Sequence, residues 1–152
     1  MSNNINPIDW SDNAVKLTRS PLTKFYRDVM VKKLKFFEIV RNENASILDF
    51  GCGKAEGYLD YKHHKHWGIM PSLYDPAIPE YENFPRGSFD GVMSFDVLEH
   101  IPEIQIPETI YQITKVANKF VFLGIATDPA IAVLPNGDNA HCTLKPMGWW
   151  VE

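Results

Sequence analysis

Short runs of consecutive apolar residues alternate with longer amphipathic stretches along this chain of 152 residues. Continuous apolar runs are typical of strands buried on both faces, and their alternation with helical stretches predicts an α/β fold with a mostly parallel sheet. A short extended piece near residues 82–84 is the weakest strand candidate. We expect the other strands at residues 46–50, at residues 67–74 with an interruption at Pro71, in a segment that begins at Phe89, and at residues 119–125.

Apolar residues recur at spacings of three and four in the amphipathic stretches, which predicts helices with one buried face. Two of these stretches open with proline, which favours the first turn of a helix. We expect helices from the Ser20-Pro21 cap to about residue 41, over residues 54–61, from Pro107 to about Asn118, and from Gly148 onward.

The first predicted strand ends in an acid and two glycines, in the order Asp49-Phe50-Gly51-Cys52-Gly53. Glycine permits a positive φ and a close approach of the backbone to a ligand. The helix that follows would present free N–H groups and a partial positive charge at its start. The segment therefore predicts a turn that binds a nucleotide-like ligand.

Two classes of cofactor fit a turn of this kind. A dinucleotide fingerprint needs glycine or alanine three residues after Gly53, where Glu56 stands instead, and a carboxylate there would repel a pyrophosphate. The Asp-x-Gly-x-Gly pattern instead resembles motif I of the class I S-adenosylmethionine (SAM) methyltransferases. The chain departs from that motif at its third glycine, where Ala55 stands.

Asp75 follows the second predicted strand and lies 22 residues after Gly53. In nucleoside-binding Rossmann-like folds, an acid at about this distance accepts hydrogen bonds from ribose hydroxyls. Asp75-Pro76 is also a common turn sequence, but its spacing from the glycine turn favours ribose binding.

The segment Ser88–Pro102 carries the most specific pattern in the chain. Phe89-Asp90 leads into a strand that is followed by Asp96-Val-Leu-Glu-His-Ile101. This segment resembles the S-F-D-x-V…V-L-E-H-I/V pattern of class I SAM methyltransferases, and with the other motifs the resemblance covers residues 46–125. It implies a three-layer αβα Rossmann-like sandwich of about five strands in the order 3-2-1-4-5, with the ligand at the carboxyl ends of the strands.

The resemblance also implies which residues hold SAM. Gly51 and Gly53 would form the backbone cradle around its methionine part, while Asp49 would orient the turn or reach the amino group through water. Asp75 would bind the ribose hydroxyls, and Asp96 would lie beside the cofactor after the fourth strand. For Asp49 and Asp96 a purely structural role at a strand end is the alternative. We therefore expect cofactor contacts from Asp49, Gly51, Cys52, Gly53, Asp75 and Asp96.

Two histidines are candidate catalytic residues. A general base is needed only when the accepting atom carries a proton that must leave. His100 belongs to the V-L-E-H pattern, and His141 stands in the long loop of residues 126–146, over the expected site. A structural role is the alternative for His100, and simple exposure on the loop is the alternative for His141.

Metal binding has little support in the sequence. Three histidines fall within residues 63–66, but no second ligand pair at a zinc-site spacing accompanies them. A cluster of Glu99, His100 and His141 would supply only two histidines and one acid. We therefore expect no metal.

Composition narrows the location and the partners. The net charge is −4, no apolar run approaches the ~20 residues of a membrane helix, and the start of the chain lacks the features of a signal peptide. Cys52 and Cys142 lie far apart and suggest no disulfide framework. We expect a cytoplasmic protein with no membrane contact, no nucleic-acid partner and a small-molecule acceptor. A protein or glycan acceptor is the alternative, because little of the chain is inserted to form a lid over the site.

The chain is expected to form one domain over residues 1–152. Residues 1–45 would form an N-terminal helical segment, residues 46–125 the cofactor-binding core, and residues 126–152 the active-site loop and the start of a further helix. Class I methyltransferases normally add two more strands, so we expect a C-terminal truncation. Self-association through the exposed edge of strand 120–125 is the alternative.

The sequence therefore predicts an enzyme that transfers a methyl group from SAM to a small molecule and releases S-adenosylhomocysteine (SAH). A noncatalytic SAM-binding or partner-binding module is the first alternative. A different nucleotide-dependent enzyme, such as a reductase, is the second.

Overall fold

A computed structural model describes residues 44–62, 64–65 and 68–151 of the chain. The helix expected from Ser20 to about residue 41 lies outside the described residues, as do His63 and His66 of the histidine run at residues 63–66.

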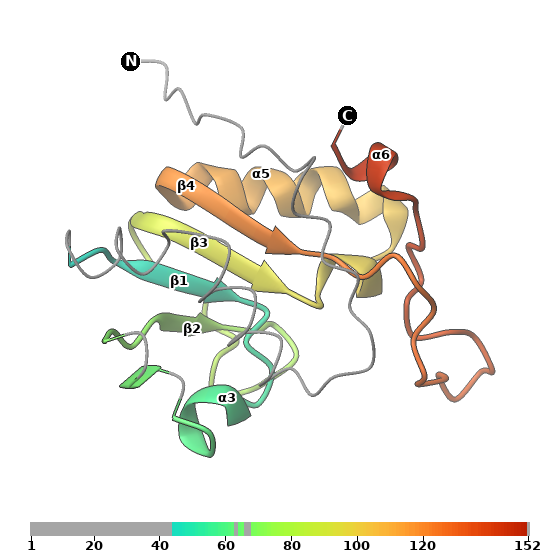
Figure 1. Ribbon diagram of the computed structural model, residues 1–152, viewed down its shortest axis with the longest axis horizontal. Coiled ribbons are helices and arrows are strands. Elements are labelled where there is room, and N and C mark those ends of the chain that lie inside the picture. Colours follow the sequence, from blue (N-terminus) through green and yellow to red (C-terminus); the bar gives the residue numbers. More distant parts are fainter. Residues whose placement is uncertain (1–43, 63, 66–67, 152) are drawn as a thin grey trace.

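The described part of the chain is built on a four-stranded parallel sheet in the order β2-β1-β3-β4 (Figure 1). Leu48 pairs with Ser72 on one side and with Val92 on the other, and Val92 pairs in turn with Val121. All four carboxyl ends therefore meet at one edge of the sheet. The strands are β1 (Ile47–Phe50), β2 (Ser72–Tyr74), β3 (Phe89–Phe95) and β4 (Ala117–Gly124).

The two central strands are buried because apolar side chains point from both of their faces. Every residue of β1 is buried, and six of the seven residues of β3 are buried. A strand of this kind must be covered on both faces, as the continuous apolar runs predicted. The structure confirms an α/β fold with a parallel, Rossmann-like sheet.

Helix α5 (Ile106–Val116) packs on β3 and β4 and confirms the helix expected after Pro107 (Figure 1). It buries Ile106, Ile113 and Val116 in the same core as Leu48 and Leu98. The other helices with bounds inside the described ranges are short: α3 (Glu56–Leu59), α6 (Met147–Trp150) and the 3-10 turns η1 (Leu98–His100) and η2 (Glu103–Gln105). None of the helices in the described ranges has the length and apolar character that a membrane crossing requires.

The fifth strand, expected near residues 82–84, is not found in the described part of the chain. Residues 75–88 connect β2 to β3 with turns and bends alone, and three of them are prolines that cannot donate a backbone hydrogen bond to a sheet. Phe84 instead packs its ring against Tyr74, with the ring centroids 4.8 Å apart. In the family's strand numbering the observed order is therefore 2-1-4-5, without strand three.

Candidate functional site

The two glycines of the turn after β1 have different surroundings. Gly51 has φ +84°, and a Cβ built on it would lie 2.3 Å from Cγ2 of Val97. Gly53 has φ +56°, but a Cβ there would meet no atom of the described residues within 4 Å. Gly51 is thus required by the close packing of the protein itself, whereas Gly53 lines open space where a ligand could lie against the backbone.

Asp75 ties the end of β2 to this glycine turn. Its Oδ2 accepts a hydrogen bond from the N–H of Gly53 at 2.9 Å, and its Oδ1 accepts one from the N–H of Ala77 at 2.9 Å. The carbonyl oxygen of Tyr74 accepts from the N–H groups of Gly51 and Cys52 at 2.7 and 3.1 Å. A carboxylate has about four lone-pair positions, so Asp75 keeps acceptor capacity for a ligand while it holds the turn.

Asp49 is a buried carboxyl group with one oxygen unpartnered. The hydroxyl of Tyr58 donates to Oδ2, while Oδ1 is buried and has no hydrogen-bond partner among the described residues. Burial raises the pKa of Asp49 to about 7, the Tyr58 hydrogen bond opposes this rise, and the Asp75 carboxylate adds to it. Buried polar atoms are normally satisfied, so Oδ1 indicates a donor beyond the described residues, such as a water molecule or a ligand.

Cys52 lies half-buried between these two acids. Burial raises the pKa of its thiol to about 12, and the negative charges of Asp49 and Asp75 contribute to the rise. Because only the thiolate is a good nucleophile, Cys52 supplies the turn with backbone groups and not with a reactive sulfur.

The two cysteines should therefore differ in their rates of alkylation. We expect iodoacetamide at pH 8 to modify the exposed Cys142 of the native chain at least about tenfold faster than Cys52, because Cys52 forms almost no thiolate. Peptide mass spectrometry after timed quenching measures both rates, with Cys142→Ser as the control. Equal rates in the folded protein would contradict the environment described for Cys52.

Asp96 occupies a strained position directly after β3. Its φ is +56°, a left-handed conformation that is uncommon outside glycine but that aspartate tolerates better than most residues. Its N–H donates to the carbonyl oxygen of Gly124 at 2.9 Å, which fixes the end of β3 against β4. Strained backbone of this kind concentrates at functional sites.

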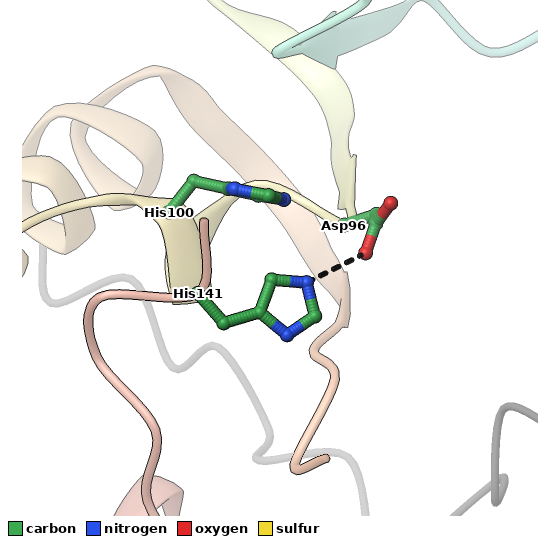
Figure 2. A group of neighbouring side chains, drawn as sticks. All are labelled: Asp96, His100 and His141. Carbon is green, nitrogen blue, oxygen red and sulfur yellow. Dashed lines mark ion pairs between the residues drawn. The ribbon is translucent and has the colours of Figure 1, made fainter. Parts of the chain in front are cut away.

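The fold brings Asp96, His100 and His141 together, although His141 lies 45 residues beyond Asp96. Figure 2 shows the three side chains converging, with His100 carried by η1 and His141 by the loop that follows β4. The imidazole rings of the two histidines stand edge to face with centroids 4.7 Å apart, and Nε2 of His141 lies 3.8 Å from Oδ1 of Asp96. A potential ligand atom from each of the three side chains lies within 4.8 Å of the others.

Glu99 and Thr143 hold the loop in this position, and the sequence did not single out either as a positioning residue. The buried carboxyl group of Glu99 accepts a hydrogen bond from the N–H of Ala126 at 2.6 Å. The backbone carbonyl oxygen of Glu99 accepts one from the N–H of Thr143 at 3.0 Å. The Thr143 hydroxyl donates to the carbonyl oxygen of Ile101 at 2.6 Å. Burial raises the pKa of Glu99 to about 7, and the Asp96 carboxylate adds to the rise.

These contacts change the composition of the cluster that the sequence suggested. Glu99 is turned into the protein toward Ala126, so the acid that faces the two histidines is Asp96. Glu99 belongs to the V-L-E-H pattern, but nothing in that pattern marks it as a residue that holds the loop after β4. Nothing in the spacing of Thr143 marks it as a residue that fixes the loop.

A family model described as a methyltransferase domain matches residues 22–129. This match covers more than half of the chain and includes the glycine turn, Asp75, Asp96 and His100. Searches of curated proteins and of solved structures found no match. The resemblance seen in the sequence is therefore confirmed, and the chain belongs to this family of methyltransferase domains.

Proposed function

We propose that this domain binds SAM at the carboxyl ends of β1 and β2 and transfers its methyl group to a small-molecule acceptor. The hydrogen bond from the N–H of Gly53 to Oδ2 of Asp75 carries the proposal. It joins the backbone that would cradle the methionine part to the acid that would accept from the ribose hydroxyls, so the two halves of the binding site are fixed to each other.

The chemistry of the residues present fits this cofactor. Gly53 leaves open space against the backbone, and the half-buried Asp75 carboxylate can accept further hydrogen bonds. The unpartnered Oδ1 of Asp49 could accept from the cofactor's ammonium group directly or through water. Together these residues offer acceptor oxygens for the ribose hydroxyls and the ammonium group of SAM, and open backbone for its methionine part.

The protein's part in methyl transfer is positioning. SAM, when bound, supplies an activated methyl group on a sulfonium, which is an excellent leaving group. The chain must hold the acceptor atom close to that methyl group and in line with it, and such alignment can supply most of the rate acceleration. His100 and His141 are the candidate bases for an acceptor whose proton must leave, because both lie in the cluster at the same edge of the sheet.

A noncatalytic SAM-binding module is the second candidate. It is supported by the short β2 and by the absence of a third family strand from the described part of the chain. SAM binding without any release of SAH across a panel of acceptors would favour this alternative over an enzyme.

Calorimetric titration of the full chain with SAM and with SAH tests the proposal. We expect wild type to bind with a dissociation constant on the order of micromolar and Asp75→Ala to bind at least about tenfold more weakly, because two acceptor oxygens are lost at the ribose position. Asp60→Ala is the matched control, since Asp60 is an exposed aspartate at the end of α3.

The result depends on Asp75→Ala remaining folded, which circular dichroism checks. Asp75→Asn is the second variant, because it keeps one oxygen to accept from the turn while it removes the charge. Equal affinity in wild type and both Asp75 variants, or no binding by a folded wild-type chain, would contradict the proposed site.

A further inference from the structure

We infer that Asp96, His100 and His141 form a binding site for a divalent transition-metal ion of the zinc type. The site lies beside the cofactor position proposed above but is made of other residues, apart from the possible cofactor contact of Asp96. With an ion bound, His100 and His141 would be metal ligands and would no longer be available as general bases. It also revises the expectation, drawn from the sequence, that the chain holds no metal.

The first argument is the protonation of the two imidazole rings. Nδ1 of His100 lies 2.9 Å from the carbonyl oxygen of Ala140, and Nδ1 of His141 lies 2.7 Å from the carbonyl oxygen of Asp128. A carbonyl oxygen can only accept, so Nδ1 must carry the proton in both rings. In the neutral form each Nε2 is then left with a free lone pair.

The second argument is where these lone pairs point. Figure 2 shows the far nitrogen of each ring directed toward the Asp96 carboxylate. The separation of 3.8 Å between Nε2 of His141 and Oδ1 of Asp96 is too long for a hydrogen bond. A lone pair that faces a carboxylate oxygen repels it unless a positive charge lies between them, and a metal ion at that point would remove the repulsion.

The third argument is that the arrangement matches how proteins present histidine to a metal. Metal-binding histidines usually donate their other N–H to a backbone carbonyl or a carboxylate, which fixes the ring and the tautomer. Both histidines make such a bond: Nδ1 of His100 donates to the carbonyl oxygen of Ala140, and Nδ1 of His141 donates to that of Asp128. Oδ1 of Asn139 also accepts from the backbone N–H of His141 at 2.9 Å, which holds the backbone that carries this ring. The rings are therefore oriented in advance.

The geometry and the ligand types indicate which ion is suitable. Ligands at about 2.0–2.2 Å from zinc stand roughly 3.4 Å apart in a tetrahedral site, so the 3.8 Å separation needs little change. The other separations in the cluster are at most 4.8 Å, so the three side chains would have to close around the ion by small shifts that keep the hydrogen bonds of both rings. Two imidazoles and one carboxylate suit zinc, cobalt or iron better than magnesium or calcium, which prefer oxygen ligands alone.

A site with three protein ligands keeps at least one open position for water or substrate. The exposed side of His100 leaves that position accessible at the edge of the sheet. If the proposed methyl transfer holds, the open position would bind an oxygen atom of the acceptor, and this last step alone rests on the proposed function.

Titration of the full chain with Zn²⁺ alone, by calorimetry and without SAM, tests the site. The sequence carries a competing histidine run at residues 63–66, so the experiment is done in parallel on His63→Ala/His64→Ala/His66→Ala. We expect one ion to bind to both proteins, and affinity to fall at least about tenfold in His100→Ala and in His141→Ala. His100 is exposed, so its replacement should leave the fold intact.

Titration with Co²⁺ identifies the ligand atoms through its visible absorption. Ligation by two histidines and one aspartate predicts d–d bands without the intense near-ultraviolet band of a thiolate ligand, and the spectrum should be lost in His100→Ala. Failure of the folded chain to bind Zn²⁺, or binding that disappears with the histidine run and is unchanged in His100→Ala and His141→Ala, would overturn the inference. SAH affinity measured on the same variants separates this result from the fate of the proposed function.

Discussion

Gly51→Ala is expected to destabilise the domain by about 2–5 kcal/mol, a large part of the ~5–15 kcal/mol that holds a typical domain folded. About 1–2 kcal/mol of this comes from a non-glycine residue at φ +84°. A further 1–3 kcal/mol, roughly, comes from overpacking, because the new Cβ would lie 2.3 Å from Cγ2 of Val97. Urea denaturation followed by circular dichroism measures the loss.

Gly137→Ala is the matched control for this variant. Gly137 has φ +90°, but in the described part of the chain a Cβ there would meet nothing within 4 Å. Its replacement should therefore cost only the conformational part, about 1–2 kcal/mol. The double variant Gly51→Ala/Val97→Ala should recover part of the stability. Equal losses in Gly51→Ala and Gly137→Ala would show that the contact between the glycine turn and Val97 is not made.

Unlike Gly51→Ala, Gly53→Ala is expected to affect SAM binding more than stability. The fold has room for the extra methyl group at Gly53, so the cost in stability should be similar to that of Gly137→Ala. The methyl group would nevertheless project into the space assigned to the cofactor. The account therefore predicts that replacement of Gly51 mainly lowers stability, whereas replacement of Gly53 mainly weakens SAM binding, which urea denaturation and calorimetric titration measure.

Asp49→Asn is expected to make the domain more stable than wild type above pH 7. Burial raises the pKa of Asp49 from its ordinary value of 3.8 to about 7 in the folded state. The folded chain therefore binds this proton more tightly than the unfolded chain does. The stabilisation is complete below about pH 4 and is lost as the pH rises through 7, with a slope of up to about 1.4 kcal/mol per pH unit.

Asparagine removes this dependence because it never ionises, while its amide oxygen can still accept from the Tyr58 hydroxyl. Urea denaturation of both proteins at pH 5, 6, 7 and 8 measures the difference. Glu99→Gln is measured in parallel. Burial also raises the pKa of Glu99 to about 7, so Glu99 contributes to the pH dependence of stability with the same sign as Asp49. A wild-type stability that rises between pH 5 and 7, or an unchanged slope in Asp49→Asn, would contradict the buried state of Asp49.

The apolar runs predicted the central sheet well because strands covered on both faces have little freedom in composition. β1 and β3 coincide closely with the expected segments, and α5 begins one residue before Pro107. The structure of the connection over residues 75–88 was harder to predict, since its aromatic residues are compatible with a strand while its prolines oppose one. The packing of Phe84 on Tyr74 satisfies the apolar side chain without any strand.

The candidate site was only partly predictable, because its parts come from distant segments. The spacing between Gly53 and Asp75 indicated a pair, and the structure joins them by a hydrogen bond. Nothing in the sequence indicated that Asp96, and not Glu99, would face His100 and His141. That choice depends on the left-handed backbone at Asp96 and on the hydrogen bond between Glu99 and Ala126, which are both consequences of tertiary packing.

Hydrogen–deuterium exchange of the full chain, with and without saturating SAH, tests the central claim most directly because it shows both binding and its place. The account predicts slower exchange in peptides that cover the glycine turn at residues 50–58 and the end of β2 at residues 73–78, and weaker protection of both peptides in Asp75→Ala at the same SAH concentration. Unchanged exchange in both peptides of a folded wild-type chain, or protection confined to other segments, would contradict a cofactor site at the carboxyl ends of β1 and β2.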